Sequence, residues 1–572
     1  MKTRMIVCAV CLLALCLGGC SGGQERESVQ AEGPQPSDSG QTVRLTLDST
    51  IQFRGTPEKP APEWGEDPVS RLLGDMAGVS VILNRNQDDM VGDSLADVLI
   101  ASGDFSDLIY VSTQEDIAKL ANADYASALD ELAADCCPTF WDNFDPMVPL
   151  NNQAEDGHVY AIRKGYRGDR FYDDPNLPLA PPRMMALRRD WLEKMGEELP
   201  QSLEELEGLL YRARDRKDEL GISVPLRLTG PLESPLSDWM GLAQEPVWDE
   251  AEQKVSTPYR EPGWLEYFRL MNRWYREGVL GLPEGEDPWT AYTARTRDGA
   301  FATGYDNQKI YAAEALFVLR EGSQSHDTPF PYVLLEQPLA YQGQVAPYAA
   351  DHEAYSTQVS VHTGAIMISK SSLKQQEALR FLHFLAGEEA MEMVRWGVEG
   401  MHYERTESGA IRYLPEYQYE DTWVYYSGPP QMRKAGIDYW LWIEDATVNG
   451  LLDASPEAYY TNSDRIALRA MEIRAGQRYK GYAAKDRNPV LSFAELPSGH
   501  GLYGASQRIA SAWLAAAQEM VTAPSDEAVV QRWEALQQQV LQEGIDQVEA
   551  AMTQRYQEAL ARYQAAGFFL EE

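Results

Sequence analysis

Adjacent carboxylates and histidines are the side chains in this sequence that could do acid–base or metal chemistry. Adjacent acids occur, for example, at Asp88-Asp89, Asp173-Asp174 and Glu388-Glu389. Glycoside hydrolysis needs two acids that flank the scissile bond, but with 88 acidic residues in the chain such pairs arise by chance. The 7 histidines are scattered without metal-ligand spacing. We therefore predict neither a catalytic centre nor a metal site.

The sequence motifs that mark common catalytic sites are missing as well. Beyond the predicted lipobox and the start of the tether, the chain has no G-x-S-x-G elbow, and it has no H-E-x-x-H pair and no G-x-x-x-x-G-K-[ST] loop. No catalytic residue and no cofactor is therefore predicted. The aromatic content is more informative, with 14 Trp and 30 Tyr. A sugar ring stacks its C–H faces on such rings, although large aromatic side chains more often pack in a core.

Charge and length limit the class of protein. The chain has 50 basic and 88 acidic residues and a formal charge of −38, which disfavours nucleic acid and anionic membrane surfaces as partners. Its 44% hydrophobic residues supply ample core. A chain of 572 residues exceeds what one hydrophobic core usually organises, so we expect at least two lobes.

The N-terminus has the pattern of a secretory signal. A basic start, Met1 to Arg4, precedes an apolar run that is too short to span a membrane. The following Leu17-Gly18-Gly19-Cys20 resembles a bacterial lipobox, which implies that residues 1–19 are removed and that Cys20 carries a lipid. Residues 20–42 are polar and predict a flexible, lipidated tether. The alternative is an ordinary signal in which Cys20 is incidental.

Two cysteines remain after this predicted cleavage, Cys136 and Cys137. Neighbouring cysteines bridge only through a strained eight-membered ring. A vicinal disulfide is an open alternative outside the cytoplasm, but we favour two small thiols that are buried or partly exposed. No later stretch is long and apolar enough to span a bilayer, so we expect the lipid alone to hold the protein at a membrane.

Strand and helix patterns alternate through the first part of the chain. Strands are predicted at 43–47, 79–83 and 108–111, and helices at 68–76 and 94–101. This alternation is typical of an open α/β sheet. Later, Ser202 and Glu205 form a capping box that begins a helix toward Arg216. The chain shows no internal sequence repeat.

Helical stripes and one further strand continue the pattern to the C-terminus. One helical face, which we assign to core packing, carries Trp264, Leu265, Phe268, Met271, Trp274 and Tyr275. A strand at 364–368 precedes a helix at 374–385. From Trp533 to Tyr563 an apolar stripe is interrupted once, at Gly544, and predicts an amphipathic helix docked on the body, with a partner-binding coiled coil as the alternative.

Several segments resemble one family in the same order along the chain. The matching segments are Leu99 to Ile109 (LIASGDFSDLI), Asp156 to Ile162 (DGHVYAI), Arg189 to Gly196 (RDWLEKMG) with Pro200 and Ser202 to Glu205, Asp298 to Ala302 (DGAFA), Phe381 to Glu389 (FLHFLAGEE), Trp396 to Glu404 (WGVEGMHYE) and Trp533 to Tyr563. Together they resemble the extracellular solute-binding lipoproteins, family 1, of bacterial ABC importers for oligosaccharides. Ser106 stands where that family usually has proline.

The resemblance implies an α/β fold of two lobes, a type II periplasmic-binding-protein-like clamp with hinge crossovers, each lobe a mixed sheet flanked by helices. It places residues 43–165 and 358–400 in lobe 1, and residues 166–357 and 401–572 in lobe 2. It implies a monomer that closes on a carbohydrate ligand and delivers it to the permease subunits of an ABC importer at the cell membrane, facing outward. No bond is made or broken in that role. Closure would work by a ligand-driven population shift.

Site residues follow by analogy with the strand ends of such folds. Hydrogen-bonding candidates are Asp48, Ser49, Ser112, Thr113 and Gln114. Stacking candidates are Trp239, Tyr305 and Trp396, with Trp423 and Trp442 behind them. Lobe-core packing is the competing interpretation of each tryptophan.

Many members of the family carry a loop rich in Asp, Asn and Gly that resembles a calcium site. The corresponding residues 215–222 have two bases and too few spaced acids, so we predict no calcium there. Two other functions remain open. One is a surface-anchored carbohydrate-active enzyme, a lyase or glycosidase, and the other is an oligopeptide-binding protein with the same clamp architecture.

Overall fold

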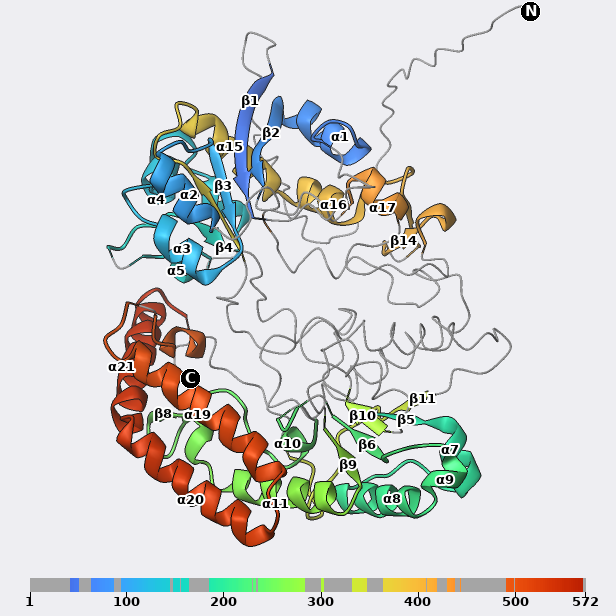
Figure 1. Ribbon diagram of the computed structural model, residues 1–572. Helices are drawn as coiled ribbons and strands as arrows, with labels where there is room; N and C mark the ends of the chain where they lie inside the picture. The colour runs from blue at the N-terminus through green and yellow to red at the C-terminus, as the bar shows by residue number, and fades with distance from the viewer. Residues whose placement is uncertain are drawn as a thin grey trace, which may run out of the picture.

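The computed structural model describes residues 42–50, 63–86, 94–144, 148–154, 156–163, 185–228, 230–232, 235–282, 300–302, 332–346, 364–407, 409–418, 430–437, 443, 490–497 and 499–568. These residues form two bodies, drawn one above the other in Figure 1. The upper body, the first lobe, contains β1–β4 and β12. The lower body, the second lobe, contains β5–β11.

The first lobe is organised on a five-stranded sheet in the order β2-β1-β3-β12-β4. Its strands are β1 (Val43–Ser49), β2 (Val79–Asn86), β3 (Leu108–Val111), β4 (Ile162–Arg163) and β12 (Ala365–Ile368). The first three strands in this order run parallel, and β12 runs antiparallel to both of its neighbours. Residues Leu108 to Val111 and Ala365 to Ile368 are almost completely buried, which explains their continuous apolar character.

Helices cover this sheet, and a hairpin extends the lobe. The helices of the first lobe are α1 (Pro68–Ala77), α2 (Leu95–Ser102), α3 (Gln114–Leu120), α4 (Leu129–Cys136), α5 (Val148–Asn151), α15 (Gln375–Leu385), α16 (Glu388–Trp396) and α17 (Pro430–Ala435). Short 3-10 turns lie at Phe140–Asn143 and Pro415–Tyr417. The hairpin consists of β13 (Tyr403–Arg405) and β14 (Ile411–Tyr413). Local chemistry sets their ends. The carboxylate of Asp67 accepts the Ser70 N–H at 2.8 Å to begin α1, and Gly78 ends it with a left-handed backbone.

The second lobe has a second five-stranded sheet, in the order β11-β5-β10-β6-β9. Its strands are β5 (Met185–Arg188), β6 (Leu226–Arg227), β9 (Leu280–Gly281), β10 (Ala300–Ala302) and β11 (Tyr332–Leu334), and a separate hairpin is made by β7 (Val247–Asp249) and β8 (Lys254–Ser256). Its helices are α7 (Arg189–Met195), α8 (Leu203–Asp215), α9 (Lys217–Leu220), α10 (Pro235–Trp239), α11 (Gly263–Arg276), α19 (Tyr503–Val521), α20 (Asp526–Gln542) and α21 (Ile545–Ala565), with 3-10 turns at Pro258–Arg260 and Leu491–Ala494.

The two sheets share one topology. In each, three parallel strands stand in the order second-first-third along the chain, β2-β1-β3 and β9-β6-β10. The next strand in each sheet is antiparallel to the third. In the second lobe it is β5, the first strand after the chain leaves the first lobe. In the first lobe it is β12, the first strand after the chain returns. The outer strand, β4 or β11, is the last before the chain leaves the lobe. The lobes are therefore two similar units, and the chain crosses between them three times, although no sequence repeat reveals the similarity.

The C-terminal stripe forms two helices rather than one. Gly544, with φ of +91°, separates α20 from α21. A backbone of that kind favours glycine, so the single interruption in the apolar pattern marks a real turn. The helix α11 packs against α19 and α20, and Trp264, Phe268 and Trp274 on its inner face are fully buried, as predicted.

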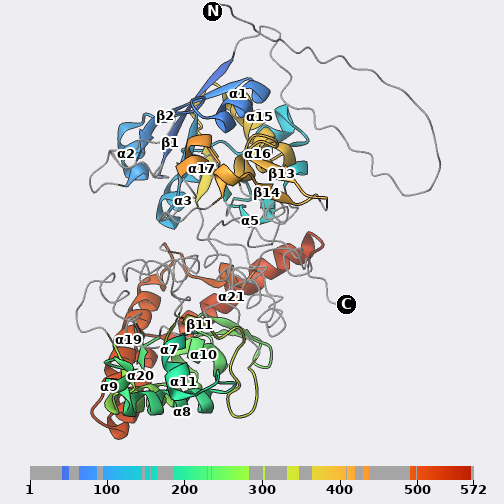
Figure 2. The same ribbon diagram turned by 90° about the vertical axis from the view of Figure 1, so that its right-hand side faces the viewer.

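The hydrophobic cores correct the expected lobe boundary. Residues 401–572 were assigned to lobe 2 from the sequence, but Tyr403, Ile411 and Met432 belong to the core of the first lobe. Figure 2 shows the β13–β14 hairpin and α17 beside α16 in the upper body. The hairpin follows α16 directly and turns back onto the same core. From Val490 onward the buried residues belong to the second core, as expected.

The remaining predicted elements agree closely with the structure. Ser202 caps α8 by accepting the Glu205 N–H at 3.1 Å, as the capping box predicts. No helix among the described residues is long and apolar enough to cross a membrane.

Candidate functional site

The carboxyl ends of β1 and β3 carry the polar residues that the sequence singled out. Because β1, β2 and β3 run parallel, these ends meet at one edge of the first sheet. Figure 1 shows that α3, which follows β3, lies on the side of the first lobe nearest the second. This edge is the candidate site.

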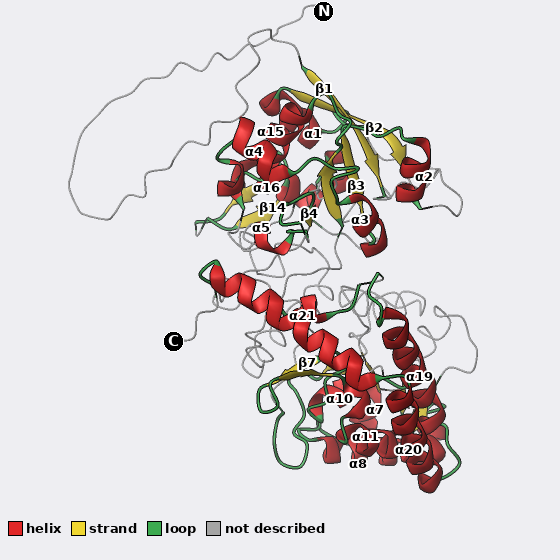
Figure 3. Cartoon of the chain, turned by 90° about the vertical axis from the view of Figure 1, so that its left-hand side faces the viewer, coloured by secondary structure: helices red, strands yellow, loops and turns green. Residues whose placement is uncertain are grey.

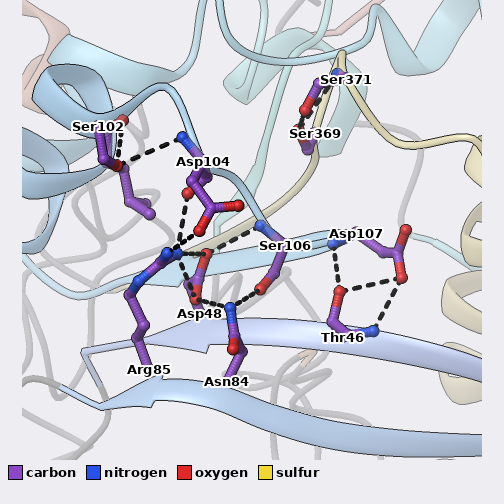
Figure 4. Close-up of polar contacts among 11 residues, drawn as sticks. Thr46, Asp48, Asn84, Arg85, Ser102, Asp104, Ser106, Asp107, Ser369 and Ser371 are labelled. Atoms are coloured by element: carbon purple, nitrogen blue, oxygen red, sulfur yellow. Dashed lines mark hydrogen bonds and ion pairs between the residues drawn. The ribbon is translucent and has the colours of Figure 1, made fainter.

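A bulge in β1 determines where Asp48 lies. The pairing of β1 with β2 shifts between Leu47 and Asp48, so that Leu47 faces Leu83 but Asp48 faces Arg85. The Asp48 carboxylate lies 3.3 Å from Arg85 and accepts the Ser106 N–H at 2.9 Å. Asn84 Nδ2 donates to it at 3.4 Å. Figure 4 shows these groups around the carboxylate.

These contacts hold the side chain of Asp48 inside the first lobe. Its side chain is fully buried, and burial raises its pKa despite the hydrogen bonds from Ser106 and the charge of Arg85. Arg85 continues the cluster by donating to the Asp104 carbonyl at 2.8 Å. Asp48 therefore holds the ends of β1 and β2 to the loop before β3. This corrects its prediction as a ligand-binding group.

A second carboxylate, that of Asp107, holds the same sheet together at the start of β3. It accepts hydrogen bonds from the N–H of Thr46 at 2.9 Å and from its hydroxyl at 3.0 Å, as Figure 4 shows. The hydroxyl of Ser372 donates to it at 2.6 Å. Burial alone would raise the pKa of Asp107, but the hydrogen bonds from Ser372 and Thr46 outweigh burial and lower it. Asp107 thus joins β1, β3 and the loop before α15.

The hydroxyl groups at the strand ends divide into buried and exposed ones. Ser49 is fully buried, whereas Ser112 and Thr113 are exposed. Thr50, which the sequence analysis did not select, donates its hydroxyl to Ser112 Oγ at 3.0 Å. Thr113 caps α3 by accepting the Asp116 N–H at 3.1 Å. The exposed polar edge is therefore Ser112 and Thr113, followed by the first helical residue, Gln114.

The two described stacking candidates pack in cores instead. Trp239, in α10, is 1% exposed and belongs to the core of the second lobe. Trp396 is 7% exposed, belongs to the core of the first lobe and lies edge-on to Tyr413 at 6.4 Å between ring centroids. Neither indole offers a face for a sugar, because the helix that carries it turns it inward. Cys20, Tyr305, Trp423 and Trp442 lie outside the described residues.

The segment that follows Trp396 is a structural turn. Gly397 has φ of +91°, and a β-carbon there would lie 2.6 Å from His402 Nδ1 and 2.9 Å from Ile437. His402 is fully buried, and its Nδ1 accepts the Val398 N–H at 2.8 Å. Burial lowers the pKa of His402 to about 4. The WGVEGMHYE segment thus folds the β13–β14 hairpin back onto the lobe through a neutral, buried histidine.

The cysteines and acidic segments add no chemistry. Cys136 and Cys137 are free thiols, and burial raises the pKa of each. Residues 215–222 include the end of α8 and the short α9, where Arg216 pairs with Glu219 at 2.6 Å. Within the part of the chain that the structure describes, no three His, Cys, Asp or Glu side chains lie close enough to hold a metal ion.

Comparisons with known proteins find likeness in structure. No protein-family model and no curated protein sequence matches the chain. An HMO-binding, ABC-transporter-associated solute-binding protein from Bifidobacterium longum infantis is 12% identical, with a TM-score of 0.57 over 90% of this chain and 98% of that one. The S. pneumoniae ABC-transporter substrate-binding protein FusA, in complex with kestose, is 15% identical, with a TM-score of 0.56 over 91% and 99%.

A third solved structure, the alginate-binding protein AlgQ2 without calcium ion, is 15% identical, with a TM-score of 0.55 over 92% of this chain and 99% of that one. At such identities the likeness concerns the fold, and it extends over nearly the whole length of each protein. The shared topology of the two sheets agrees with it. The chain therefore has the two-lobed fold of the solute-binding proteins of ABC transporters.

Proposed function

We propose that this protein is the substrate-binding component of an ABC importer and that it captures an oligosaccharide between its lobes. The observation that carries the proposal is the likeness over nine-tenths or more of the chain to proteins whose names specify HMO binding, alginate binding or a complex with kestose. The joined pair of similar lobes supports it, since two units linked by crossing strands can close on a ligand. The protein would act as a monomer, make or break no bond, and pass the ligand to membrane permease subunits.

The exposed edge at Ser112 is the ligand contact that we propose for the first lobe. Ser112 Oγ accepts a hydrogen bond from Thr50, so its own O–H can donate to a sugar hydroxyl. We expect Ser112→Ala to weaken binding about fivefold, the effect of one lost hydrogen bond. Ser511→Ala, an exposed serine in α19, is the matched control and leaves binding unchanged. Equal affinity of Ser112→Ala and wild type would remove this edge from the site.

A thermal-shift screen tests the function itself. A ligand that binds only the native state stabilises it by about 2.7 kcal/mol at a hundred times its dissociation constant. We expect a rise in melting temperature with oligosaccharides and none with oligopeptides. The reverse result would identify an oligopeptide-binding protein. New reducing ends or unsaturated sugars in the same samples would identify a lyase or glycosidase instead.

The lipid anchor is a separate part of the proposal. It rests on the sequence alone, from the basic start to Cys20. We expect the wild-type protein to stay with the membrane fraction on the outer side of the cell, and Cys20→Ser to leave it. Retention of Cys20→Ser in the membrane fraction would show that another segment holds the protein there.

A further inference from the structure

The short helix α5 contacts both lobes. Val148 at its start is buried in the core of the first lobe. Leu150, two residues later, packs against the core of the second lobe. Asn151 at its end is 4% exposed. One helical turn is therefore shared between two cores that otherwise consist of different residues.

Tyr563 of α21 reaches α5 from the second lobe. Its side chain is fully buried, and its ring lies 6.2 Å from that of Phe493 in the second core, measured between ring centroids. Its hydroxyl donates to Asn151 Oδ1. Burial raises the pKa of Tyr563, so the hydroxyl stays protonated and can donate at any physiological pH. A core residue of one lobe thus forms a buried hydrogen bond with the other lobe.

The same segment holds the strand by which the chain leaves the first lobe. Asn152, next to Asn151, accepts the Arg163 N–H with its Oδ1 at 2.9 Å. Its Nδ2 donates to the Val148 carbonyl at 2.8 Å. Arg163 is the last residue of β4, after which the chain crosses to β5. A displacement of α5 would therefore also move the start of the crossing.

The helix α21 is fastened at its other end to the second lobe. Glu549 accepts the N–H of Thr257 at 3.1 Å and its hydroxyl at 2.6 Å. Thr553 accepts the Val255 N–H at 2.9 Å. Figure 3 shows α21 running as one straight helix from the second lobe toward the first. A helix of 21 residues spans about 30 Å, so it can transmit the position of one lobe to the other.

We propose that the C-terminal end of α21 is an interlobe clasp, in which the Tyr563–Asn151 hydrogen bond sets the angle between the lobes at the exit of β4. The clasp uses none of the residues proposed to contact the ligand and acts on the protein without ligand. It biases the balance between lobe arrangements and connects the lobes in addition to the three crossings of the chain. Removal of the hydroxyl leaves Asn151 buried without this donor and releases the constraint.

The test measures the interlobe distance in the full chain without any sugar, so failure of the proposed function leaves it intact. Spin labels are attached to Leu373→Cys in the first lobe and Leu514→Cys in the second, both exposed positions, in a Cys136→Ser background. Pulsed electron–electron double resonance then gives the distribution of distances between the two labels. We expect Tyr563→Phe to change the ratio of lobe arrangements about fivefold, as a lost hydrogen bond would.

Matched variants decide the result. Tyr556→Phe alters another buried tyrosine of α21, which packs on Trp248 within the second lobe, and leaves the distribution unchanged. Asn151→Ser reproduces the effect of Tyr563→Phe, and the two changes together add nothing further. A wild-type distribution in both Tyr563→Phe and Asn151→Ser would overturn the clasp, as would the same change in Tyr556→Phe. Circular dichroism verifies that each variant is folded. If Tyr563→Phe does not fold, Asn151→Ser alone decides.

Discussion

The buried histidine of the turn before β13 gives the sharpest prediction of stability against pH. His402 has a pKa of about 4 in the folded protein, against 6.5 for an ordinary histidine, and burial is the cause. Its Nδ1 accepts the Val398 N–H, so a proton cannot be added there without losing that hydrogen bond. The neutral form is therefore the one that the fold stabilises.

The sign and size follow from linkage. Because the folded pKa is depressed, the stabilisation is fully present above pH 6.5 and is lost as the pH falls toward 4. At 1.36 kcal/mol per pKa unit, the first lobe loses about 2 kcal/mol at pH 5 and about 3 kcal/mol at pH 4, relative to pH 7. His402→Asn keeps an acceptor near Nδ1 and does not titrate. It should lower stability at pH 7 and reduce the dependence on pH.

The assay is urea unfolding at pH 4, 5 and 7, followed by hydrogen exchange of peptides from residues 397–413. This readout isolates the first lobe, since two lobes need not unfold together. The quantity compared is the stability difference between wild type and His402→Asn, which cancels the titration of the many acidic groups. It should shrink by about 3 kcal/mol from pH 7 to pH 4.

The control is His500→Asn in the second lobe. His500 also accepts a local backbone N–H, that of Leu502 at 3.1 Å, but it is partly exposed. Its substitution should leave the pH dependence of the first lobe unchanged. A stability difference between wild type and His402→Asn that stays constant from pH 7 to pH 4 would refute the assignment of a neutral, buried His402.

Three further predictions concern single contacts in the first lobe. Gly397→Ala should destabilise it by about 3 kcal/mol in urea unfolding, from backbone strain and overlap with His402, whereas Gly400→Ala, with open space at its β-carbon, should cost about 1 kcal/mol; equal costs would contradict the close approach. Trp396→Ala should cost about 3–5 kcal/mol, while Trp396→Phe should keep wild-type ligand affinity in a titration; lost affinity in the folded Phe variant would return Trp396 to the site. Asp107→Asn should cost about 1–3 kcal/mol at pH 7 and less as the pH falls through the ordinary aspartate range, because the folded pKa is lowered; a cost that is the same at pH 3 and pH 7 would exclude an ionised Asp107.

The fold could be predicted in large part because its elements are locally encoded. The buried strand at Leu108–Val111 is a short apolar run between breakers, and Ser202 caps α8 through its own hydroxyl. The placement of the β13–β14 hairpin could not be predicted in this way. Its assignment to the first core depends on the turn at Gly397 and His402, where two residues five apart meet.

The meeting of the strand ends at the candidate site could be predicted, whereas the contacts of the side chains there could not. The carboxyl ends of β1 and β3 do meet at one edge, as parallel strands require. The bulge before Asp48 decides whether its carboxylate can contact a ligand, because the bulge brings Arg85 opposite it. The sequence pattern does not indicate this bulge. A tryptophan at helical spacing likewise has the same pattern in a core as in a binding site, and Trp396 proves to be in the core.

Native mass spectrometry of the purified protein with a pool of oligosaccharides tests the central claim most directly. It reports at once the number of protein copies, the number of ligands and whether the ligand is intact. A monomer that binds unaltered oligosaccharides one at a time is the result that we predict. Complexes that contain only shortened or unsaturated sugars, or no sugar complex across the pool, would contradict it.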